Sequence, residues 1–379
     1  MAPDGAVGYN GRRLTALRNI WGMTQTALAQ RLHVTQSFLS QVEHGDRPVP
    51  ESLVLAASQD FGLPVAFFFV QPTPLESGPV TFRKTSRASA KDEARVVGLY
   101  DEAARLFRTV SVESGFVSAD LPDPSKFHDD PEEVAIALRR AAGLADDDPV
   151  LNATRCLERM GIGVVDHLDD PAAGSTPAHT GVSRPSRLND RPLVALAAVV
   201  PGAVKRLTIL HEGYHLIADR DLLGPIASTR SHEEQRAFEF ASAFLLPDKV
   251  LRSRVSESLN LHGFLPIKAD YGISVGAIIR RAKNRGVIST DRYRSLNIQL
   301  SSSGWKTNEP VEVADEKPLL FGQALTKAFG SQSVARASHV VGVAPAWIHR
   351  WTNAPASEPS TSTPGRVIDM FERRRDSAN

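Results

Sequence analysis

The chain has 379 residues, and 42% of them are hydrophobic, so it can bury a sizeable core and build two or three domains. Its 44 basic residues nearly balance its 43 acidic ones, and the formal charge of +1 excludes a polycation that binds nucleic acid or membranes along its whole length. The single cysteine, Cys156, excludes both an internal disulfide and a zinc site built from several thiolates.

No segment of the sequence predicts insertion into a membrane. The first 14 residues lack the apolar stretch of a secretion signal. The longest apolar run, residues 193–204, is too short to span a bilayer and contains a proline. We therefore expect a cytoplasmic protein without membrane contacts.

Polar segments that contain proline divide the chain. Residues 71–79 interrupt helical periodicity with prolines and small polar residues, as a domain boundary does. Residues 301–317 and 354–364 have the composition of a linker and a loose tail. The predicted parts are an N-terminal domain at 1–75, a second domain at 80–300 that starts with a connecting helix at 88–112, and a helical C-terminal region with a loose tail at 315–379.

The N-terminal domain shows short helices separated by turn signals. Thr24 and Thr35 are placed to cap the second and third helices, and Gly45 ends the third. The third helix turns polar residues outward, namely Gln36, Ser37, Ser40 and Gln41. This spacing is typical of a helix-turn-helix.

Residues 24–29 (TQTALA) and 34–45 (VTQSFLSQVEHG) resemble the phage-repressor (Xre) family of DNA-binding domains, and the resemblance covers residues 10–68. It implies that the third helix enters the major groove of double-stranded operator DNA and suggests a homodimer. The DNA-binding residues that it implies are Gln25, Thr35, Gln36, Ser37, Ser40, Gln41 and Arg47, with Gln25 near a phosphate. Arg12, Arg13 and Arg18 would add contacts to the DNA backbone. The alternative is a helical bundle whose polar face binds no DNA.

A candidate metal motif follows a predicted strand at residues 193–196. Helical periodicity over residues 204–218 places His211 and His215 four residues apart, so both imidazoles lie on one face, about 5–6 Å apart, and can share a tetrahedral metal. Glu212 is rotated by about 100° from His211, which makes it a poor third ligand but a suitable base for a water molecule at the metal.

A second helix offers the third ligand. Glu234 lies at the head of an apolar stripe that Pro247 ends, so its carboxylate can point toward the two histidines. The alternative is a capping box, in which Ser231 caps the helix and Glu234 reaches back to its backbone. His232 and Glu233 are the fallback ligands.

Residues 206–208 (RLT), 211–215 (HEGYH) and 234–247 (EQRAFEFASAFLLP) are similar to the ImmA/IrrE family of metallopeptidases, and the similarity runs from residue 86 to residue 289. It implies Zn²⁺ held by His211, His215 and Glu234, Glu212 as catalytic base, and a repressor or related regulator as protein substrate. The chain departs from the family at Gly213-Tyr214, usually Leu-Gly, and at Phe238, usually Asn. The Phe238 change favours the alternative of a non-proteolytic regulator, or an antitoxin-like protein, whose peptidase-like domain senses a ligand or binds a partner.

Three further features complete the predictions. Residues 267–288 form a second helix-turn-helix-like pattern with a basic run at 280–285, which we interpret as part of the peptidase domain, with DNA binding as the alternative. Residues 334–351 form a third such pattern, with Trp347, Ile348 and Trp351 as core. The group that stabilises an oxyanion stays open among His232, Tyr214 and Tyr271.

The expected fold class is mainly α with a small α+β part. We expect a five-helix helix-turn-helix domain, then a zincin-like metallopeptidase domain, and finally a helical C-terminal region.

Overall fold

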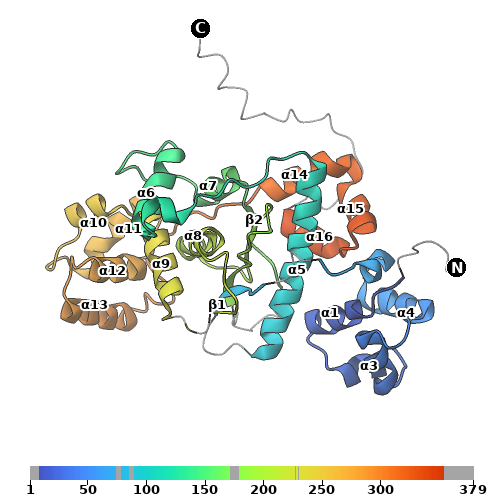
Figure 1. Ribbon diagram of the computed structural model, residues 1–379. Coiled ribbons are helices and arrows are strands. Elements are labelled where there is room, and N and C mark those ends of the chain that lie inside the picture. Colours follow the sequence, from blue (N-terminus) through green and yellow to red (C-terminus); the bar gives the residue numbers. More distant parts are fainter. Residues whose placement is uncertain are drawn as a thin grey trace, which may run out of the picture.

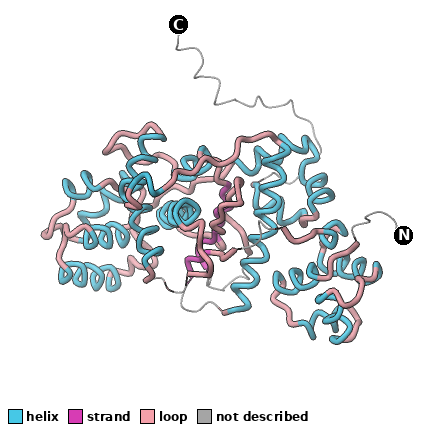
Figure 2. The backbone as a smooth tube through the Cα atoms, viewed as in Figure 1, coloured by secondary structure: helices cyan, strands magenta, loops and turns pink. Residues whose placement is uncertain are grey.

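The computed structural model describes residues 8–73, 78–84, 89–170, 179–226, 228 and 230–353. Most of these residues are helical, and one small sheet lies near the middle of the molecule (Figure 1; Figure 2). This arrangement confirms the predicted class, mainly α with a small α+β part. Within the described residues, no helix combines the length and the apolar character needed to cross a membrane.

The N-terminal helices begin and end where the capping residues predict. Thr24 and Thr35 accept hydrogen bonds from the backbone N–H groups of Ala27 and Phe38, and Gly45 ends the third helix at a φ of 86°. The segment has four α-helices and one 3₁₀-helix: α1 (Arg12–Ile20), α2 (Gln25–Arg31), α3 (Gln36–His44), α4 (Glu51–Phe61) and η1 (Val65–Phe69). The five predicted helices are thereby confirmed.

The connecting helix α5 (Ala90–Glu113) packs against α1. Gly98 permits this approach, because a Cβ at its position would lie 2.7 Å from Cγ1 of Ile20. Across the same contact, Nη2 of Arg13 lies 2.6 Å from Oε1 of Glu102, and both side chains are largely buried. This helix covers nearly the residues at which a connecting helix was predicted, 88–112, and apolar packing and an ion pair fix it to the N-terminal helices. Three shorter segments follow: η3 (Pro124–Phe127), α6 (Pro131–Ala141) and α7 (Ala153–Arg159).

The four-stranded sheet separates two apolar cores. Its strands are β1 (Thr81–Lys84), β2 (Gly163–Val165), β3 (His179–Ser183) and β4 (Leu193–Leu196), in the order β1-β3-β4-β2. Only the β2–β4 pair is parallel among these strands. Alternate residues of β4 enter different cores, since Val194 packs with α8 on one side and Leu193 packs with α5 on the other. Figure 1 shows these two helices on opposite sides of the sheet.

The first core is built by α8 (Gly202–Ala218) and the helices after it. These are α9 (His232–Leu245), α10 (Asp248–Arg254), η4 (Leu261–Phe264), α11 (Leu265–Tyr271), α12 (Val275–Asn284) and α13 (Thr290–Ser302). Arg281 of the basic run on α12 is 1% exposed, donates to the carbonyl of Leu246 over 2.9 Å and pairs with Glu132 over 2.6 Å. These contacts support the interpretation of the basic run as part of this helical domain.

The segment between α13 and the C-terminal helices packs closely onto α8. Glu316 is buried, accepts hydrogen bonds from the N–H groups of Ala153 and Thr154, at 3.0 and 2.8 Å, and pairs with Arg206 of α8. The segment predicted as a linker, residues 301–317, connects α13 to the C-terminal helices: α13 occupies its first two residues, and Glu309 and Glu316 hold it by ion pairs with Lys268 and Arg206. The predicted tail at 354–364 lies outside the described residues.

The C-terminal helices complete the second core. They are α14 (Leu320–Phe329), η5 (Gly330–Gln332), α15 (Ser333–Val341) and α16 (Pro345–Thr352). Trp347 lies against Trp21 of the N-terminal helices with ring centroids 5.4 Å apart, and Nε1 of Trp351 donates to the carbonyl of Leu168 over 2.9 Å. The predicted core positions Trp347, Ile348 and Trp351 are all buried. One core thus joins the N-terminal helices, α5, the sheet and the C-terminal helices.

Candidate metal centre

Two imidazoles and one carboxylate converge between α8 and α9. The Nε2 atoms of His211 and His215 lie 3.2 Å apart. Oε2 of Glu234 is 3.2 Å from Nε2 of His211, and Oε1 is 3.6 Å from Nε2 of His215. One ligand atom from each residue lies within 4.8 Å of the other two, and all three side chains are buried. The structure therefore brings together the three residues that the sequence proposed as ligands.

The start of α9 explains how Glu234 reaches this position. The N–H of Glu234 donates to Oγ of Ser231 over 3.3 Å, so Ser231 caps the helix as the capping-box alternative requires. The carboxylate of Glu234, however, faces the two histidines. Capping therefore uses the backbone N–H of Glu234 and leaves its carboxylate available to a metal ion. Among the described residues, the fallback ligands His232 and Glu233 lie outside the cluster.

Asp219 fixes the orientation of His215 and was not predicted from the sequence. Its Oδ2 lies 2.5 Å from Nδ1 of His215, one turn along α8, and both side chains are buried. Burial alone would lower the pKa of His215, but the hydrogen bonds to Asp219 and Glu234 outweigh burial and raise the pKa to about 10 in the metal-free protein. A carboxylate at Nδ1 leaves Nε2 as the donor for a metal.

Glu234 is an anion in this cluster. Burial acts to raise its pKa, but the hydrogen bonds from His211 and His215 outweigh burial and lower the pKa to about 2. Two imidazoles and a carboxylate are a donor set that proteins use for catalytic zinc, with a fourth position left open. The donor chemistry of these three residues therefore fits a divalent metal ion.

Glu212 lies beside the cluster but faces the sheet. Its Oε2 accepts hydrogen bonds from Oγ of Ser183 over 2.8 Å and from Oγ1 of Thr81 over 3.2 Å. The side chain is 0% exposed, and burial raises its pKa to about 7. A pKa near neutrality suits a general base. The hydroxyls of β1 and β3 that hold Glu212 were missed, because nothing in the sequence indicates that these two strands pair.

Two domain families match the chain. A model of helix-turn-helix domains matches residues 11–66, and a model of IrrE N-terminal-like domains matches residues 163–283, which contain the whole metal cluster. The chain joins a helix-turn-helix domain to an IrrE-like domain. Both resemblances expected from the sequence are thereby confirmed.

Curated relatives match a short part of the chain. The HTH-type transcriptional regulator RamB of Mycobacterium tuberculosis is 41% identical over 63 residues, which are 17% of this chain and 13% of that protein. The propionyl-CoA carboxylase regulator of Cereibacter sphaeroides is 42% identical over 57 residues, 15% of this chain and 12% of that protein. The regulator PrpR of M. tuberculosis is 35% identical over 60 residues, 16% of this chain and 12% of that protein. The matches thus span about an eighth of these relatives, and no solved structure matches.

In the helix-turn-helix domain, four of the predicted DNA-binding residues belong to α3, and the others lie on α2 or next to the ends of α3. Gln36 and Ser37 are exposed, whereas Ser40 and Gln41 are half-buried. Gln36 donates to Oε1 of Gln25, whose Nε2 donates to Glu43 over 2.9 Å, so this pair is held in place before any DNA binds.

The arginines of this domain differ in how far their side chains are available to contact DNA. Arg47 is exposed and lies over the ring of Phe38, at 5.7 Å from its centroid. Arg18 is half-buried and pairs with Glu43 over 3.0 Å. Arg13 is buried against Glu102, so the prediction that it contacts the DNA backbone was wrong.

Gly213 and Tyr214, where the metal motif departs from the family, are closely packed in the IrrE-like domain. A Cβ at Gly213 would meet Cδ2 of Leu157 at 3.0 Å, and the ring of Tyr214 stacks on Phe240 with centroids 4.9 Å apart. The hydroxyl of Tyr214 is hydrogen-bonded to Arg236 over 3.0 Å, and that of Tyr271 donates to the carbonyl of Asp147 over 2.9 Å. Both tyrosine hydroxyls are therefore engaged away from the metal cluster.

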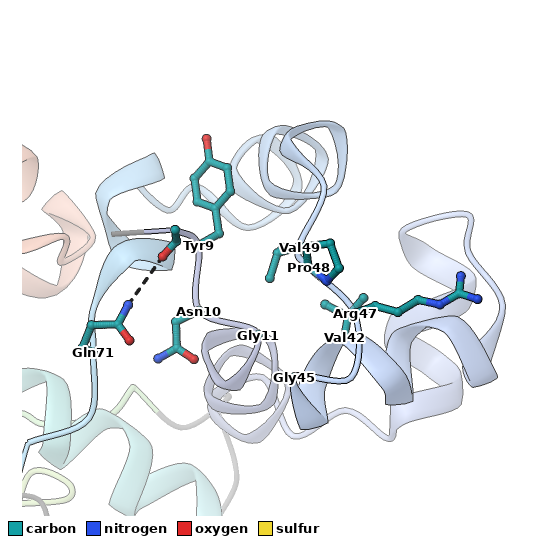
Figure 3. A pocket seen from close by; sticks show the side chains of 10 residues that line it. Tyr9, Asn10, Gly11, Val42, Gly45, Arg47, Pro48, Val49 and Gln71 are labelled. Atoms are coloured by element: carbon teal, nitrogen blue, oxygen red, sulfur yellow. Dashed lines mark hydrogen bonds between the residues drawn. The ribbon is translucent and has the colours of Figure 1, made fainter. Parts of the chain in front are cut away.

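One cavity lies away from this chemistry. It measures about 680 Å³ and lies in the helix-turn-helix domain, between the start of α1 and the loop after α3 (Figure 3). Its lining includes Tyr9, Gly11, Val49 and Arg47. Its lining has no histidine, cysteine, aspartate or glutamate. We therefore place the candidate functional site at the donor set of α8 and α9.

Proposed function

We propose that this protein is a DNA-binding transcriptional regulator whose IrrE-like domain is a zinc-dependent endopeptidase that cleaves a repressor or related regulatory protein. The observation that carries the proposal is the convergence of His211, His215 and Glu234 within bonding reach of one ion, next to a buried glutamate. The helix-turn-helix domain would bind operator DNA as a homodimer through α3. Its contacts to base edges would come from Gln36, Ser37 and Gln41.

The side chains around the cluster have separate roles in the proposed hydrolysis. When bound, Zn²⁺ supplies Lewis acidity that polarises a peptide carbonyl and acidifies water. Glu212, with its pKa of about 7, takes the proton from the attacking water and passes it to the leaving amine. Asp219 keeps His215 in the orientation that offers Nε2 to the metal.

One observation favours a second function, a regulator that binds metal, ligand or partner without cleaving anything. Glu212 is completely buried beneath Thr81 of β1 and Ser183 of β3. A general base must lie within hydrogen-bond reach of the proton that it removes. Proteolysis therefore requires water and substrate to reach the buried Glu212, whereas metal binding does not.

The test compares the protein ends that the wild type and a Glu212→Gln variant generate in cells. Both would be produced, zinc-replete and in full length, in a host whose own copy of the gene is deleted, and new protein N-termini would be sequenced. The peptidase proposal predicts new ends with the wild type and none with the variant. Glu233→Gln is the matched control, because Glu233 lies outside the cluster, and it should behave as the wild type. Identical ends in all three strains, with zinc bound in each, would establish the non-proteolytic regulator instead.

A further inference from the structure

Two features of the IrrE-like domain have no part in the proposed hydrolysis, and the structure brings them together. Phe238 of α9 stands where similar proteins usually carry asparagine. Arg280 opens the basic run on α12. Cζ of Arg280 lies 3.8 Å from the centroid of the Phe238 ring, so the guanidinium stacks on the aromatic face.

This stacked pair lies next to the metal cluster. Phe238 follows Glu234 by one helical turn, so the two side chains occupy the same face of α9, and both are buried. Burial lowers the pKa of Arg280, and the charge of Glu234 is among those that oppose this effect. A cation is therefore held close to the carboxylate ligand of the proposed metal.

Arg280 differs from its neighbours in the basic run. Arg281 pairs with Glu132 over 2.6 Å, and Arg285 pairs with Asp248 over 3.0 Å. Arg280 is half-buried, and within the part of the chain that the structure describes it has neither an ion pair nor a hydrogen bond. A guanidinium has five N–H donors. Among the described residues, no nitrogen of Arg280 belongs to the fully buried side-chain atoms that lack a hydrogen-bond partner, so these donors face solvent and are available to an anionic group.

We propose that Arg280 binds the carboxylate group of a peptide ligand at the metal centre. Phe238 occupies one face of the guanidinium and leaves the N–H groups at its edge free for a bidentate carboxylate. The inference rests on the proposed function, because the ligand must reach the metal cluster. Phe238, which this chain has in place of the usual asparagine, then supports Arg280 by stacking, and Arg280 binds the anion.

The test measures peptide binding to the full-length protein substituted with Co²⁺, whose visible spectrum reports on groups near the ion. The probes are an acetylated tri-alanine peptide with a free C-terminus, its C-terminal amide, and the amide of acetyl-Ala-Glu-Ala. We expect Arg280→Gln to weaken binding of a carboxylate-bearing peptide about 10-fold, as loss of a charge-assisted hydrogen bond does, and Arg280→Lys to weaken it less. Lys283→Gln, an exposed position on the same helix, should change nothing. The peptide that loses affinity identifies the source of the carboxylate, C-terminus or acidic side chain.

Equal affinities for the wild type and Arg280→Gln, with stoichiometric Co²⁺ in both, would overturn the inference and leave the proposed function standing. The same conclusion would follow if Arg280→Gln lowered only the thermal unfolding temperature, because Arg280 would then serve only to cover Phe238. Failure of the wild type to bind Co²⁺ would instead remove the proposed function, and the inference with it.

Discussion

Oδ2 of Asp219 lies 2.5 Å from Nδ1 of His215, one helical turn along α8, on the opposite side of the imidazole from Glu234. Because a carboxylate at Nδ1 stabilises the proton there, it leaves the Nε2 lone pair for a metal. Asp219 is buried and is the C-cap residue of the helix, where its backbone N–H donates to the carbonyl of His215, so the backbone sets the position of its side chain.

Replacing Asp219 with asparagine should weaken zinc binding without unfolding the protein. Loss of such an outer carboxylate typically lowers metal affinity roughly 10- to 100-fold. Competition with a chelating dye measures the affinity, and circular dichroism checks the fold. Asp221→Asn is the matched control, because Asp221 is exposed and pairs only with Arg187 in the described contacts. Equal zinc affinity in Asp219→Asn and the wild type would contradict the assigned role.

The parts of the site that were predicted from the sequence depend on local geometry. The helical period places His211 and His215 on one face, and an apolar stripe followed by Pro247 defines α9, with Glu234 at its head. The capping residues Thr24, Thr35 and Ser231 likewise mark helix starts that the structure confirms.

The parts that were missed depend on contacts between distant segments. Thr81 and Ser183 meet Glu212 only because β1 pairs with β3 across about a hundred residues of chain. Arg13 looked like a DNA contact because its burial against Glu102 of α5 is not a local property. Glu316 looked like part of a polar linker until its pairing with Arg206 was known.

The stability of the metal-free protein should depend on pH through Glu212. Burial raises its folded pKa to about 7, against about 4.3 in an unfolded chain. The folded state therefore keeps a proton in this window, and the free energy of unfolding falls as the pH rises through it, by roughly 4 kcal/mol in all. Glu212→Gln lacks this proton. Urea unfolding of both proteins at several pH values should show the variant gaining stability relative to the wild type between about pH 4 and pH 8. A difference that does not change with pH would contradict the buried, protonated glutamate.

The ion pair between Arg13 and Glu102 should hold the helix-turn-helix domain against α5. Burial acts to raise the pKa of Glu102, but Arg105 and Arg13 outweigh it and lower the pKa, so the pair is charged at neutral pH. Glu102→Gln leaves a buried guanidinium without its anion, which typically costs about 3–5 kcal/mol. Urea unfolding measures the loss.

The matched control for this ion pair is Asp60→Asn. Asp60 pairs with Arg31 over 3.3 Å on the surface, where such pairs contribute less than about 1 kcal/mol. Similar losses in Glu102→Gln and Asp60→Asn would show that α5 does not depend on the buried pair. Because the pKa of Glu102 is lowered, its contribution should also disappear as the pH falls below the ordinary range of a carboxyl group.

The proposed DNA contacts predict two different effects on binding. Gln36→Ala should relax sequence preference, at a cost of about 1–3 kcal/mol on the preferred DNA, because a base-edge contact is lost. Arg47→Ala should weaken binding to all sequences alike and reduce the salt slope by about 1. Selection from random double-stranded DNA, followed by titration at several salt concentrations, measures both effects. Gln30→Ala, exposed on α2, is the control. An unchanged preference in Gln36→Ala would exclude α3 as the recognition helix.

Elemental analysis of the purified protein tests the metal centre most directly. The wild type, Glu233→Gln and Glu234→Gln would be purified in parallel and dialysed against the same zinc buffer. We predict about one zinc ion per chain in the wild type and in Glu233→Gln, and far less in Glu234→Gln, because Glu234, unlike Glu233, belongs to the cluster with the two histidines. Equal zinc content in the two variants, or a wild type without zinc, would contradict a centre formed by His211, His215 and Glu234.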